Sequence, residues 1–226
     1  MKILFLGRDG CDYSQQIFGI LQNVSSEVTY VGVSDRGQTI PTSIRKWSGD
    51  YIFAFRSFYI LPEEVLGAAR IAAINFHPGP PEYPGSGCVN FALYEGSPEF
   101  GVTAHLMVAK IDSGPILRVA RFPVVDSDNL INLLPKVHSA LYLLAKEVID
   151  YIFTSGEDSP IQKMQISCME KWTGKKRKIS DLNKLQIVDR NIKKSELEKV
   201  IRSTHLTDYP VKIKLYGREF YLDIKS

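Results

Sequence analysis

The chain contains few cysteines and carries a small net charge. Its three cysteines, Cys11, Cys88 and Cys168, are widely separated and form no Cys-x-x-Cys pair. This spacing argues against a disulfide framework or a zinc site and favours a reducing compartment, so we expect a cytoplasmic protein without a bound metal. We expect Cys88 to be a buried core residue. The formal net charge of +3 is too small to indicate a nucleic-acid partner.

Long apolar stretches are also absent. The run at residues 3–7 is too short for the apolar region of a secretory signal peptide, and no later run approaches transmembrane length. We therefore expect neither a signal peptide nor a membrane partner. The one strongly biased segment, residues 171–178, carries five cations around Trp172. It is either an anion-binding loop or, as is commoner for such a run, a solvated loop. Trp172 is a candidate for stacking on a base or a sugar, although such a residue is more commonly packed or partly exposed.

Apolar runs alternate with helical stretches in the first half of the chain. The composition, 44% hydrophobic and 23% charged, is that of an ordinary globular protein. Asp12 or Ser14 is expected to cap the first helix. Strands that alternate with helices form βαβ units, so the pattern predicts an α/β fold with a mostly parallel sheet and flanking helices. The predicted strands are residues 2–6, 28–33, 51–55 and 71–76, and the predicted helices are residues 13–21 and 63–69.

The second half begins with longer elements and ends with shorter ones. A helix is predicted at residues 86–94, and a long amphipathic helix at residues 129–153, with two strands between them at 102–108 and 116–122. Beyond Thr154 the Gly, Ser, Pro and Lys content rises. We therefore expect a main domain over residues 1–155 and a small C-terminal region over residues 156–226. The elements predicted in that region are a helix at residues 193–203 and a β-hairpin with strands 211–215 and 219–224.

Two polar side chains stand at the end of the predicted strand 71–76. Because side chains alternate along a strand, Asn75 and His77 point to the same face and Phe76 to the other. An oxyanion donor beside a proton acceptor is what acyl transfer needs. A lone Asn or His at a strand end is more commonly a satisfied polar group near a turn. A carboxylate, Asp112, follows in an Asp-Ser-Gly-Pro turn, and we place it near His77 as a hypothesis.

Other polar residues follow the ends of two further predicted strands. Ligands of an open parallel sheet bind outside the carboxyl ends of its strands, so we expect these residues to share one crevice with Asn75 and His77. The Gly-x-x-Gly at residues 7–10 is too short for a dinucleotide fingerprint, and it is either a phosphate-approaching turn or a plain turn. The candidate substrate-binding residues at these strand ends are Arg8, Asp9, Gly10, Arg56 and Ser57.

Three segments together resemble the N10-formyltetrahydrofolate-dependent formyltransferases. They are Asn75-Phe76-His77-Pro78, the Gly-Val-Thr-Ala-His run at residues 101–105, and the Asp-Ser-Gly-Pro-Ile-Leu run at residues 112–117. The resemblance covers roughly residues 50 to 125, and it includes the Ile-Leu-Pro-Glu-Glu-Val-Leu run at residues 60–66. It implies a Rossmann-like catalytic domain, N10-formyltetrahydrofolate as co-substrate, no metal, and an Asn75, His77 and Asp112 triad.

The resemblance also implies a role for each member of the triad. As an amine attacks the formyl carbon, negative charge builds on the formyl oxygen, and Asn75 would donate to it, a contribution of about 10²–10³ in rate. His77 would take the amine proton or polarise the formyl group, and Asp112 would orient the imidazole. By the same resemblance the Phe58 to Leu66 segment and the Asp112 loop would hold the pterin. The folate-binding candidates are therefore Phe58, Ile60, Leu61, His105 and Asp112.

The run after the histidine indicates a subgroup. Residues 78–85 read Pro-Gly-Pro-Pro-Glu-Tyr-Pro-Gly and depart from the Ser-Leu-Leu-Pro usual in the tRNA and purine enzymes. They resemble the sugar N-formyltransferases that act on nucleotide-linked amino sugars, so Pro80 and Tyr83 join the substrate-binding candidates. Residues 178–182 and 201–204 of the tail also resemble that subgroup. The small C-terminal region of the subgroup's members commonly takes part in dimer formation, so we expect a homodimer.

The resemblance thus predicts a sugar N-formyltransferase that acts on a thymidine diphosphate-linked dideoxyamino sugar for surface polysaccharide, such as the O-antigen of lipopolysaccharide. Three alternatives stay open. A purine-pathway formyltransferase is argued against by the missing Ser-Leu-Leu-Pro. A formyltetrahydrofolate hydrolase would use water in place of the amine. A non-catalytic ligand-binding module would have no need of the complete Asn75, His77 and Asp112 set.

Overall fold

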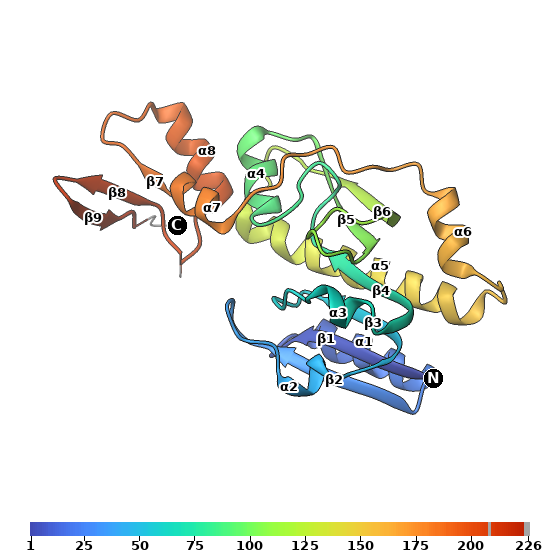
Figure 1. Ribbon diagram of the computed structural model, residues 1–226. Helices are drawn as coiled ribbons and strands as arrows, with labels where there is room; N and C mark the ends of the chain where they lie inside the picture. The colour runs from blue at the N-terminus through green and yellow to red at the C-terminus, as the bar shows by residue number, and fades with distance from the viewer. Residues whose placement is uncertain (208, 224–226) are drawn as a thin grey trace.

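The larger part of the molecule is built on one six-stranded sheet. The computed structural model describes residues 1–207 and 209–223. The sheet has the order β2-β1-β3-β4-β5-β6 (Figure 1). The first four strands in sequence run parallel to one another. Strand β5 runs antiparallel to β4, and β6 runs antiparallel to β5, so the predicted mostly parallel sheet is confirmed. The strands are β1 (Lys2–Arg8), β2 (Glu27–Val33), β3 (Gly49–Phe55), β4 (Ala69–His77), β5 (Glu99–Leu106) and β6 (Ile116–Pro123).

Both faces of the central strands β1 and β3 are buried. On β1, Ile3 and Phe5 belong to the core under helices α1 (Asp12–Val24), α4 (Cys88–Glu95) and α5 (Leu130–Thr154), as the hydrophobic residues of those helices do. Leu4 and Leu6 belong to the second core, with residues of and around α2 (Thr42–Arg45) and α3 (Glu63–Leu66). Strands covered on both faces read as continuous apolar runs rather than alternating ones, which is why these strands were predictable.

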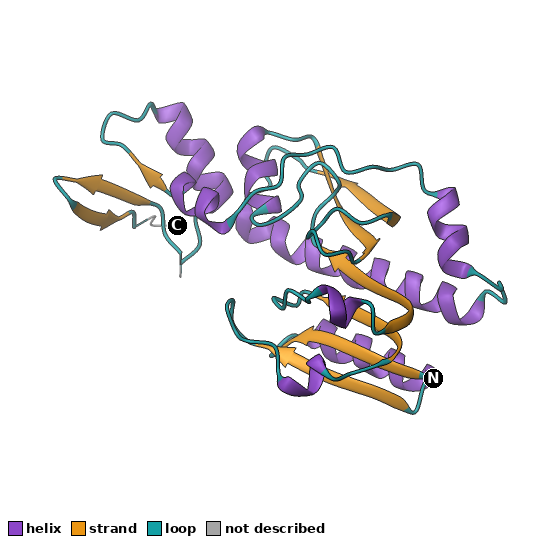
Figure 2. Ribbon diagram, in the orientation of Figure 1, coloured by secondary structure: helices purple, strands orange, loops and turns teal. Residues whose placement is uncertain are grey.

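The C-terminal region begins against the main sheet and ends beside it (Figure 2). Helix α6 (Pro160–Ser167) packs against β6 and α5, and an extended segment then leads to α7 (Ile179–Leu185). The small sheet has the order β7-β8-β9, built from β7 (Ile187–Val188), β8 (Lys212–Leu215) and β9 (Arg218–Tyr221). Helix α8 (Lys194–Thr204) packs against α4, and this part lies to one side of the main sheet (Figure 2).

The predicted elements are present with some errors at their ends. The helix predicted at residues 63–69 ends at Leu66, because Ala69 already begins β4. The capping prediction is wrong: Cys11 is the N-cap of α1 and makes no side-chain cap, and Ser14 Oγ accepts a hydrogen bond from the Arg8 amide at 3.1 Å. The predicted strand 219–224 ends at Tyr221 in the structure, and its last residue lies outside the described residues.

Helices α2, α6 and α7 and strand β7 were not predicted. They are short, between two and eight residues, and two to eight residues are too few for a periodic apolar pattern. The division between residues 155 and 156 stays a prediction. None of the helices in the described part of the chain combines the length and the apolarity that a membrane span requires.

Helix α5 provides a matched test of the core. Leu141 is fully buried in it, whereas Leu143 is 59% exposed. We expect Leu141→Ala to lower the free energy of unfolding by about 2–5 kcal/mol, because it removes buried methyl groups and leaves a cavity. Leu143→Ala should change it by less than about 0.5 kcal/mol. Urea denaturation of both variants measures the difference, and equal effects would show that α5 does not pack on the sheet as described.

Candidate active site

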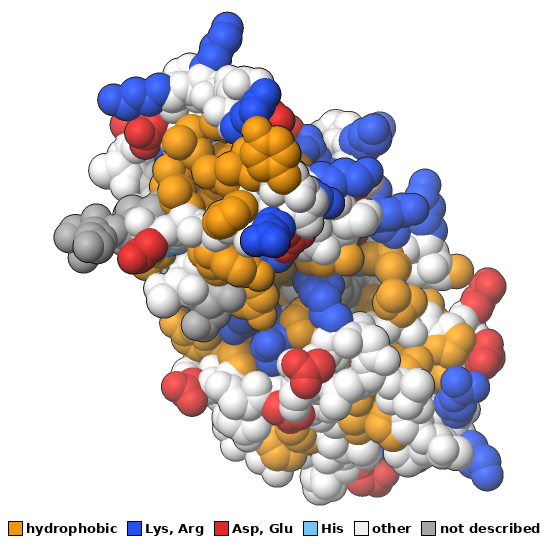
Figure 3. Space-filling model, turned by 90° about the vertical axis from the view of Figure 1, so that its left-hand side faces the viewer, with side chains coloured by type: hydrophobic (Ala, Val, Ile, Leu, Met, Phe, Trp, Pro, Cys, Tyr) orange, Lys and Arg blue, Asp and Glu red, His pale blue; other side chains and the backbone are white. Residues whose placement is uncertain are grey.

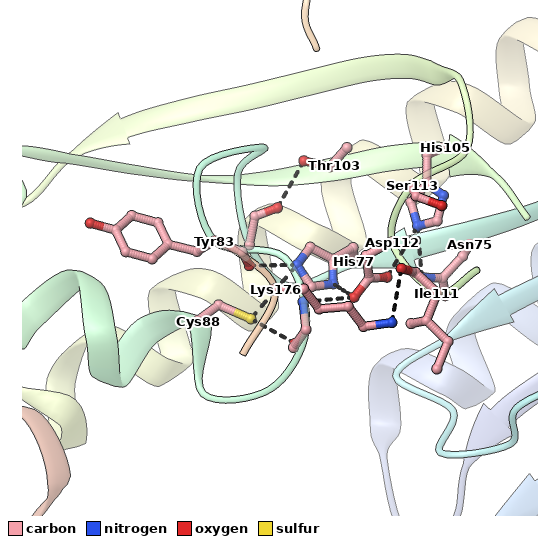
Figure 4. Close-up of polar contacts among 12 residues, drawn as sticks. Asn75, His77, Tyr83, Cys88, Thr103, His105, Ile111, Asp112, Ser113 and Lys176 are labelled. Atoms are coloured by element: carbon pink, nitrogen blue, oxygen red, sulfur yellow. Dashed lines mark hydrogen bonds and ion pairs between the residues drawn. The ribbon is translucent and has the colours of Figure 1, made fainter. Parts of the chain in front are cut away.

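The sheet order brings the predicted site residues to one edge. Strands β1, β3 and β4 are adjacent and parallel, so their carboxyl ends lie side by side. On β4, Asn75 pairs with His105 of β5, and His77 pairs with Thr103. The side chains of Asn75, His77, His105 and Asp112 converge in Figure 4. The hypothesis that placed Asp112 beside His77 therefore agrees with the geometry.

His77 is buried with a hydrogen-bond acceptor or a charge at each ring nitrogen. Its Nε2 lies 3.1 Å from the carbonyl oxygen of Tyr83, and because a carbonyl can only accept, Nε2 carries a proton. Its Nδ1 lies 3.6 Å from Asp112 Oδ2, which favours a proton there as well. Burial alone would lower the pKa of His77, but the carboxylate of Asp112 and the nearby Cys88 outweigh it and raise that pKa to about 9. The resting form at neutral pH is thus the imidazolium.

His105 orients the amide of Asn75. The Nδ1 of His105 lies 2.8 Å from the Leu106 carbonyl oxygen, so Nδ1 is the donor. In the neutral ring Nε2 is then an acceptor, and it lies 3.1 Å from Asn75 Nδ2. One N–H of the Asn75 amide is used in this way, and the second N–H is left to donate to a ligand.

Asp112 occupies a strained backbone position and carries a buried charge. Its φ of 48° lies in the left-handed region, which Asp tolerates better than most residues. The backbone amide of Gly85 donates to Oδ2 at 2.9 Å, and His105 Nε2 lies 3.5 Å from Oδ1. Burial would raise the pKa of Asp112, but the charge of His77 and the hydrogen bond from the Gly85 amide contribute to lowering it, to about 2. The group therefore stays ionised and holds His77 protonated.

Two residues of the site were not assigned to it from the sequence. Cys88 is buried as predicted, but its Sγ also lies 3.7 Å from His77 Nε2. Trp172 packs its indole against both imidazoles, with ring centroids 5.7 Å from His77 and 5.1 Å from His105. The sequence indicated Trp172 only as a candidate for stacking on a base or a sugar, not as a neighbour of the two imidazoles. A lone aromatic within the basic run at residues 171–178 was the one signal that could have found it.

A second cluster lies at the ends of β1 and β3. The guanidinium groups of Arg8 and Arg36 lie 4.2 Å and 4.4 Å from the centroid of the Phe58 ring. Arg56, with a left-handed φ of 55°, donates from Nη1 to Cys11 Sγ at 3.3 Å. Among the residues that the structure describes, none of the three arginines forms an ion pair with a carboxylate.

The arginine cluster (Arg8, Arg36 and Arg56) creates a positive potential that lowers the pKa of nearby cationic groups. Burial, Arg56 and Arg8 together lower the pKa of His138 on α5 to about 4. Burial and Arg8 also lower the pKa of Arg36. The Nη1 atom of Arg8 is buried without a hydrogen-bond partner. Figure 3 shows a hollow in this side of the molecule that holds Lys or Arg side chains beside hydrophobic ones. An anionic group would compensate this charge.

The remaining candidates lie in varied surroundings. Asp9 is exposed and accepts a hydrogen bond from Ser34 Oγ at 3.0 Å. Ser57 Oγ accepts from the Tyr59 amide at 3.3 Å. Tyr83 offers the site its backbone carbonyl, because its ring packs toward Phe100.

Four more candidates complete the set. Gly10 has a φ of 66°, which suits a tight turn. Pro80 is buried, and its carbonyl accepts from the Tyr83 amide. Leu61 is buried in the second core, whereas Ile60 is 64% exposed. Over the described residues, no group of three or more His, Cys, Asp or Glu side chains is arranged as a metal site.

The sequence matches a known family. Residues 9–149, more than half of the chain, match the model of the formyl transferase family. The chain therefore belongs to the formyl transferase family, and the prediction of a formyltransferase is confirmed at that level. The methionyl-tRNA formyltransferase of Bacteroides thetaiotaomicron is 31% identical over 110 residues, 47% of this chain and 32% of that protein. The match thus spans about a third of that curated relative.

Solved structures share the fold over the whole chain. A sugar N-formyltransferase from Shewanella sp. superposes with a TM-score of 0.76 at 19% identity, covering 100% of this chain and 98% of that one. The N-formyltransferase from Helicobacter canadensis, in complex with folinic acid and dTDP-3-aminofucose, has a TM-score of 0.70 at 14% identity and covers 96% and 85%. The fold of the whole chain is therefore similar to that of these solved structures.

The His77–Asp112 pair predicts a pH dependence of stability. The pKa of His77 rises from 6.5 to about 9, so its contribution, on the order of 3 kcal/mol, is complete below pH 6.5 and is lost as the pH rises through 9. The pKa of Asp112 falls from 3.8 to about 2, so its contribution is complete above pH 3.8 and is lost as the pH falls through 2. Urea unfolding from pH 5 to 10 should show the alkaline loss in the wild type and not in His77→Gln. Parallel curves would rule out the raised pKa.

Proposed function

We propose that the chain transfers the formyl group of N10-formyltetrahydrofolate to the amine of a nucleotide-linked deoxyamino sugar, with a thymidine diphosphate sugar as the first choice. The observation that carries this proposal is that the arginine cluster lies at the same edge of the sheet as the triad, with Arg56 one strand away from it. Phe55 pairs with Phe76 across β3 and β4, so Arg56 follows β3 beside His77. Neighbouring strands are about 4.8 Å apart, so one ligand reaches both clusters.

The triad residues supply an oxyanion site and a proton. The free N–H of Asn75 donates to the formyl oxygen, where negative charge develops as the amine attacks, and the positive charge of the His77 imidazolium stabilises that oxygen. The new C–N bond forms to the acceptor nitrogen, and the bond from the formyl carbon to N10 breaks. His77 gives its proton to the departing N10 and regains the proton that the amine loses. Asp112 favours the imidazolium form of His77 and orients the ring.

The arginine cluster suits the diphosphate of a nucleotide sugar. Guanidinium groups bind phosphate oxygens in pairs, and here three of them have no carboxylate partner in the described chain. The Helicobacter canadensis protein, solved with folinic acid and dTDP-3-aminofucose, supports both substrates. On this proposal Arg8, Asp9, Gly10, Arg56, Ser57, Pro80 and Tyr83 lie toward the sugar nucleotide, and Phe58, Ile60, Leu61 and His105 toward the folate.

A phosphate alone does not separate sugar from purine substrates, since a glycinamide ribonucleotide also carries one. The whole-length similarity to the Shewanella sugar enzyme favours the sugar, because it includes the C-terminal region. Residues 78–85 favour it as well, through their departure from Ser-Leu-Leu-Pro.

The C-terminal region is proposed to form a homodimer. Its hairpin exposes three aromatic side chains: Tyr216 is 92% exposed, Phe220 52% and Tyr221 62%. Figure 3 shows a patch of hydrophobic side chains on the face of the molecule that the C-terminal part occupies. Exposed apolar patches mark interaction surfaces, and strand β9 also has a free edge for pairing among the described strands. We place the boundary of this region after residue 155.

The reaction is tested by release of tetrahydrofolate from N10-formyltetrahydrofolate with a panel of thymidine-, guanosine- and uridine-diphosphate amino sugars. We expect turnover with one nucleotide sugar and a loss of at least about 10²-fold in Asn75→Ala, which removes the oxyanion donor. Glycinamide ribonucleotide and a reaction without acceptor are the controls. Turnover without acceptor indicates the hydrolase, turnover with the ribonucleotide indicates the purine enzyme, and no turnover indicates a binding module.

The arginine cluster is tested by Arg8→Ala. We expect it to raise KM for the nucleotide sugar about 10-fold or more, because a charge-assisted pair of hydrogen bonds to phosphate is lost, and to leave KM for the folate unchanged. Arg45→Ala, an exposed arginine on α2, is the matched control and should change neither constant. An equal effect of Arg8→Ala on both substrates would remove Arg8 from the diphosphate site.

A further inference from the structure

The segment at residues 168–178, here called the strap, connects α6 with α7 and runs back over the main sheet (Figure 1). It is held by backbone hydrogen bonds to the loop that follows His77. Lys176 adds a side-chain bond from Nζ to the carbonyl oxygen of Ile111, next to Asp112. The backbone bonds are Thr173 N to Pro81 O and Gly174 N to Pro81 O, both 3.2 Å, Arg177 N to Pro84 O at 3.1 Å, and Ser86 N to Arg177 O at 2.9 Å.

The strap and the loop approach so closely that glycine is needed on both sides. A Cβ on Gly174 would lie 1.7 Å from the Glu82 carbonyl oxygen, and a Cβ on Gly85 would lie 2.2 Å from the Arg177 carbonyl oxygen. The strap is therefore seated on this loop through its backbone, while Lys171, Lys175, Lys176 and Lys178 are exposed, as expected of a solvated run. The Gly85 amide is also the donor to Asp112, so strap, loop and carboxylate form one connected unit.

Arg121 ties the same unit to the sheet. Its guanidinium binds Glu82 of the loop at 2.9 Å, Glu170 of the strap at 2.9 Å, and Glu99 of β5 at 3.2 Å. Exposed ion pairs contribute little one by one, but here three carboxylates from three segments share one cation. The strap is thus fixed on both sides of Trp172.

Trp172 is where the strap reaches the reacting groups. Its ring plane is inclined at 70° to the ring of His77 and at 87° to that of His105. Its Nε1–H donates to the carbonyl oxygen of Gly114 at 2.8 Å, two residues after Asp112. One side chain therefore contacts both imidazoles and the loop of the carboxylate.

The contacts of Asp112 with the two imidazoles are long, so their geometry needs support from the indole. The nitrogen to oxygen distances, 3.6 Å for His77 to Asp112 and 3.5 Å for His105 to Asp112, exceed those of strong charge-assisted hydrogen bonds, which are about 2.7–2.9 Å. Each imidazole also has one nitrogen bonded to a backbone carbonyl, Nε2 of His77 to Tyr83 and Nδ1 of His105 to Leu106. One such hydrogen bond still allows the ring to tilt. A packed ring at right angles removes this freedom.

We propose that Trp172 is a positioning residue for formyl transfer, which holds the imidazoles of His77 and His105 at the carboxylate of Asp112. The proposal rests on the proposed function, because it concerns the same reaction. The strap presents Trp172 and excludes water on its side of the triad, so substrates enter from the side of the arginine cluster.

Replacement of Trp172 separates positioning from binding. We expect Trp172→Ala to lower kcat about 100-fold with little change in either KM, because loss of alignment costs rate rather than affinity. Trp172→Phe keeps a ring but loses the N–H, and should lose less. Gly174→Ala keeps Trp172 and displaces the strap, and it should reproduce the loss in kcat. The proposal would be overturned if Trp172→Ala left kcat unchanged, or if it raised KM by the same factor by which it lowered kcat.

The control and an independent readout use the other tryptophan. Trp47 is 7% exposed in the second core, so Trp47→Phe should lower stability without a change in kcat. The chain has two tryptophans, so this variant keeps Trp172 alone as a fluorescent probe. A protonated imidazole quenches an indole that it contacts, so emission should rise with pH and the rise should diminish in His77→Gln. This titration needs no substrate. If the wild type is inactive with every acceptor, the proposed function fails, and an emission unaffected by His77→Gln overturns the positioning role on its own.

Discussion

The buried carboxylate of Asp112 is the interaction on which the site depends. An ionised group inside a protein is costly unless charges and hydrogen-bond donors surround it. Here two histidines on adjacent strands and the amide of Gly85 do so. This requirement fixes the register of β4 against β5, the path of the loop after His77 and the left-handed turn at Asp112 itself. The positions of Asn75 and Trp172 follow from those of the two imidazoles.

The two clusters at the sheet edge differ in electrostatic character. The triad is internally compensated, with His77 positive and Asp112 negative at neutral pH. The arginine cluster is not compensated by any ion pair in the described chain, and Arg56 adopts a left-handed backbone. Strained residues persist where surrounding structure holds them, and they concentrate at functional sites. A positive hollow also raises the encounter rate of an anionic substrate, at a rate that falls with salt.

The sequence predicted the sheet well and the site in part. Strands buried on both faces are visible as apolar runs, and alternation placed Asn75 and His77 on one face without further knowledge. The proximity of Asp112 to His77 came from the resemblance, because no local pattern reports a contact across 35 residues. The place of Arg36 beside Arg8 and the contact of Trp172 with the imidazoles were beyond reach for the same reason, since each residue comes from a loop whose course is set by tertiary contacts. The capping error at α1 has another cause: Ser14 offers its oxygen to the amide of Arg8, outside the helix.

The strap has a consequence for how the molecule folds. Asn75, His77 and Asp112 lie within a stretch of 38 residues, but Trp172 meets His77 only after α5 and α6 have crossed the sheet. Contacts between residues so far apart in sequence form late, because closing the long loop costs entropy before the contact stabilises the chain. A chain still emerging during synthesis can therefore assemble the sheet with the triad in place while its indole wall is missing. The site is complete only once the strap has docked.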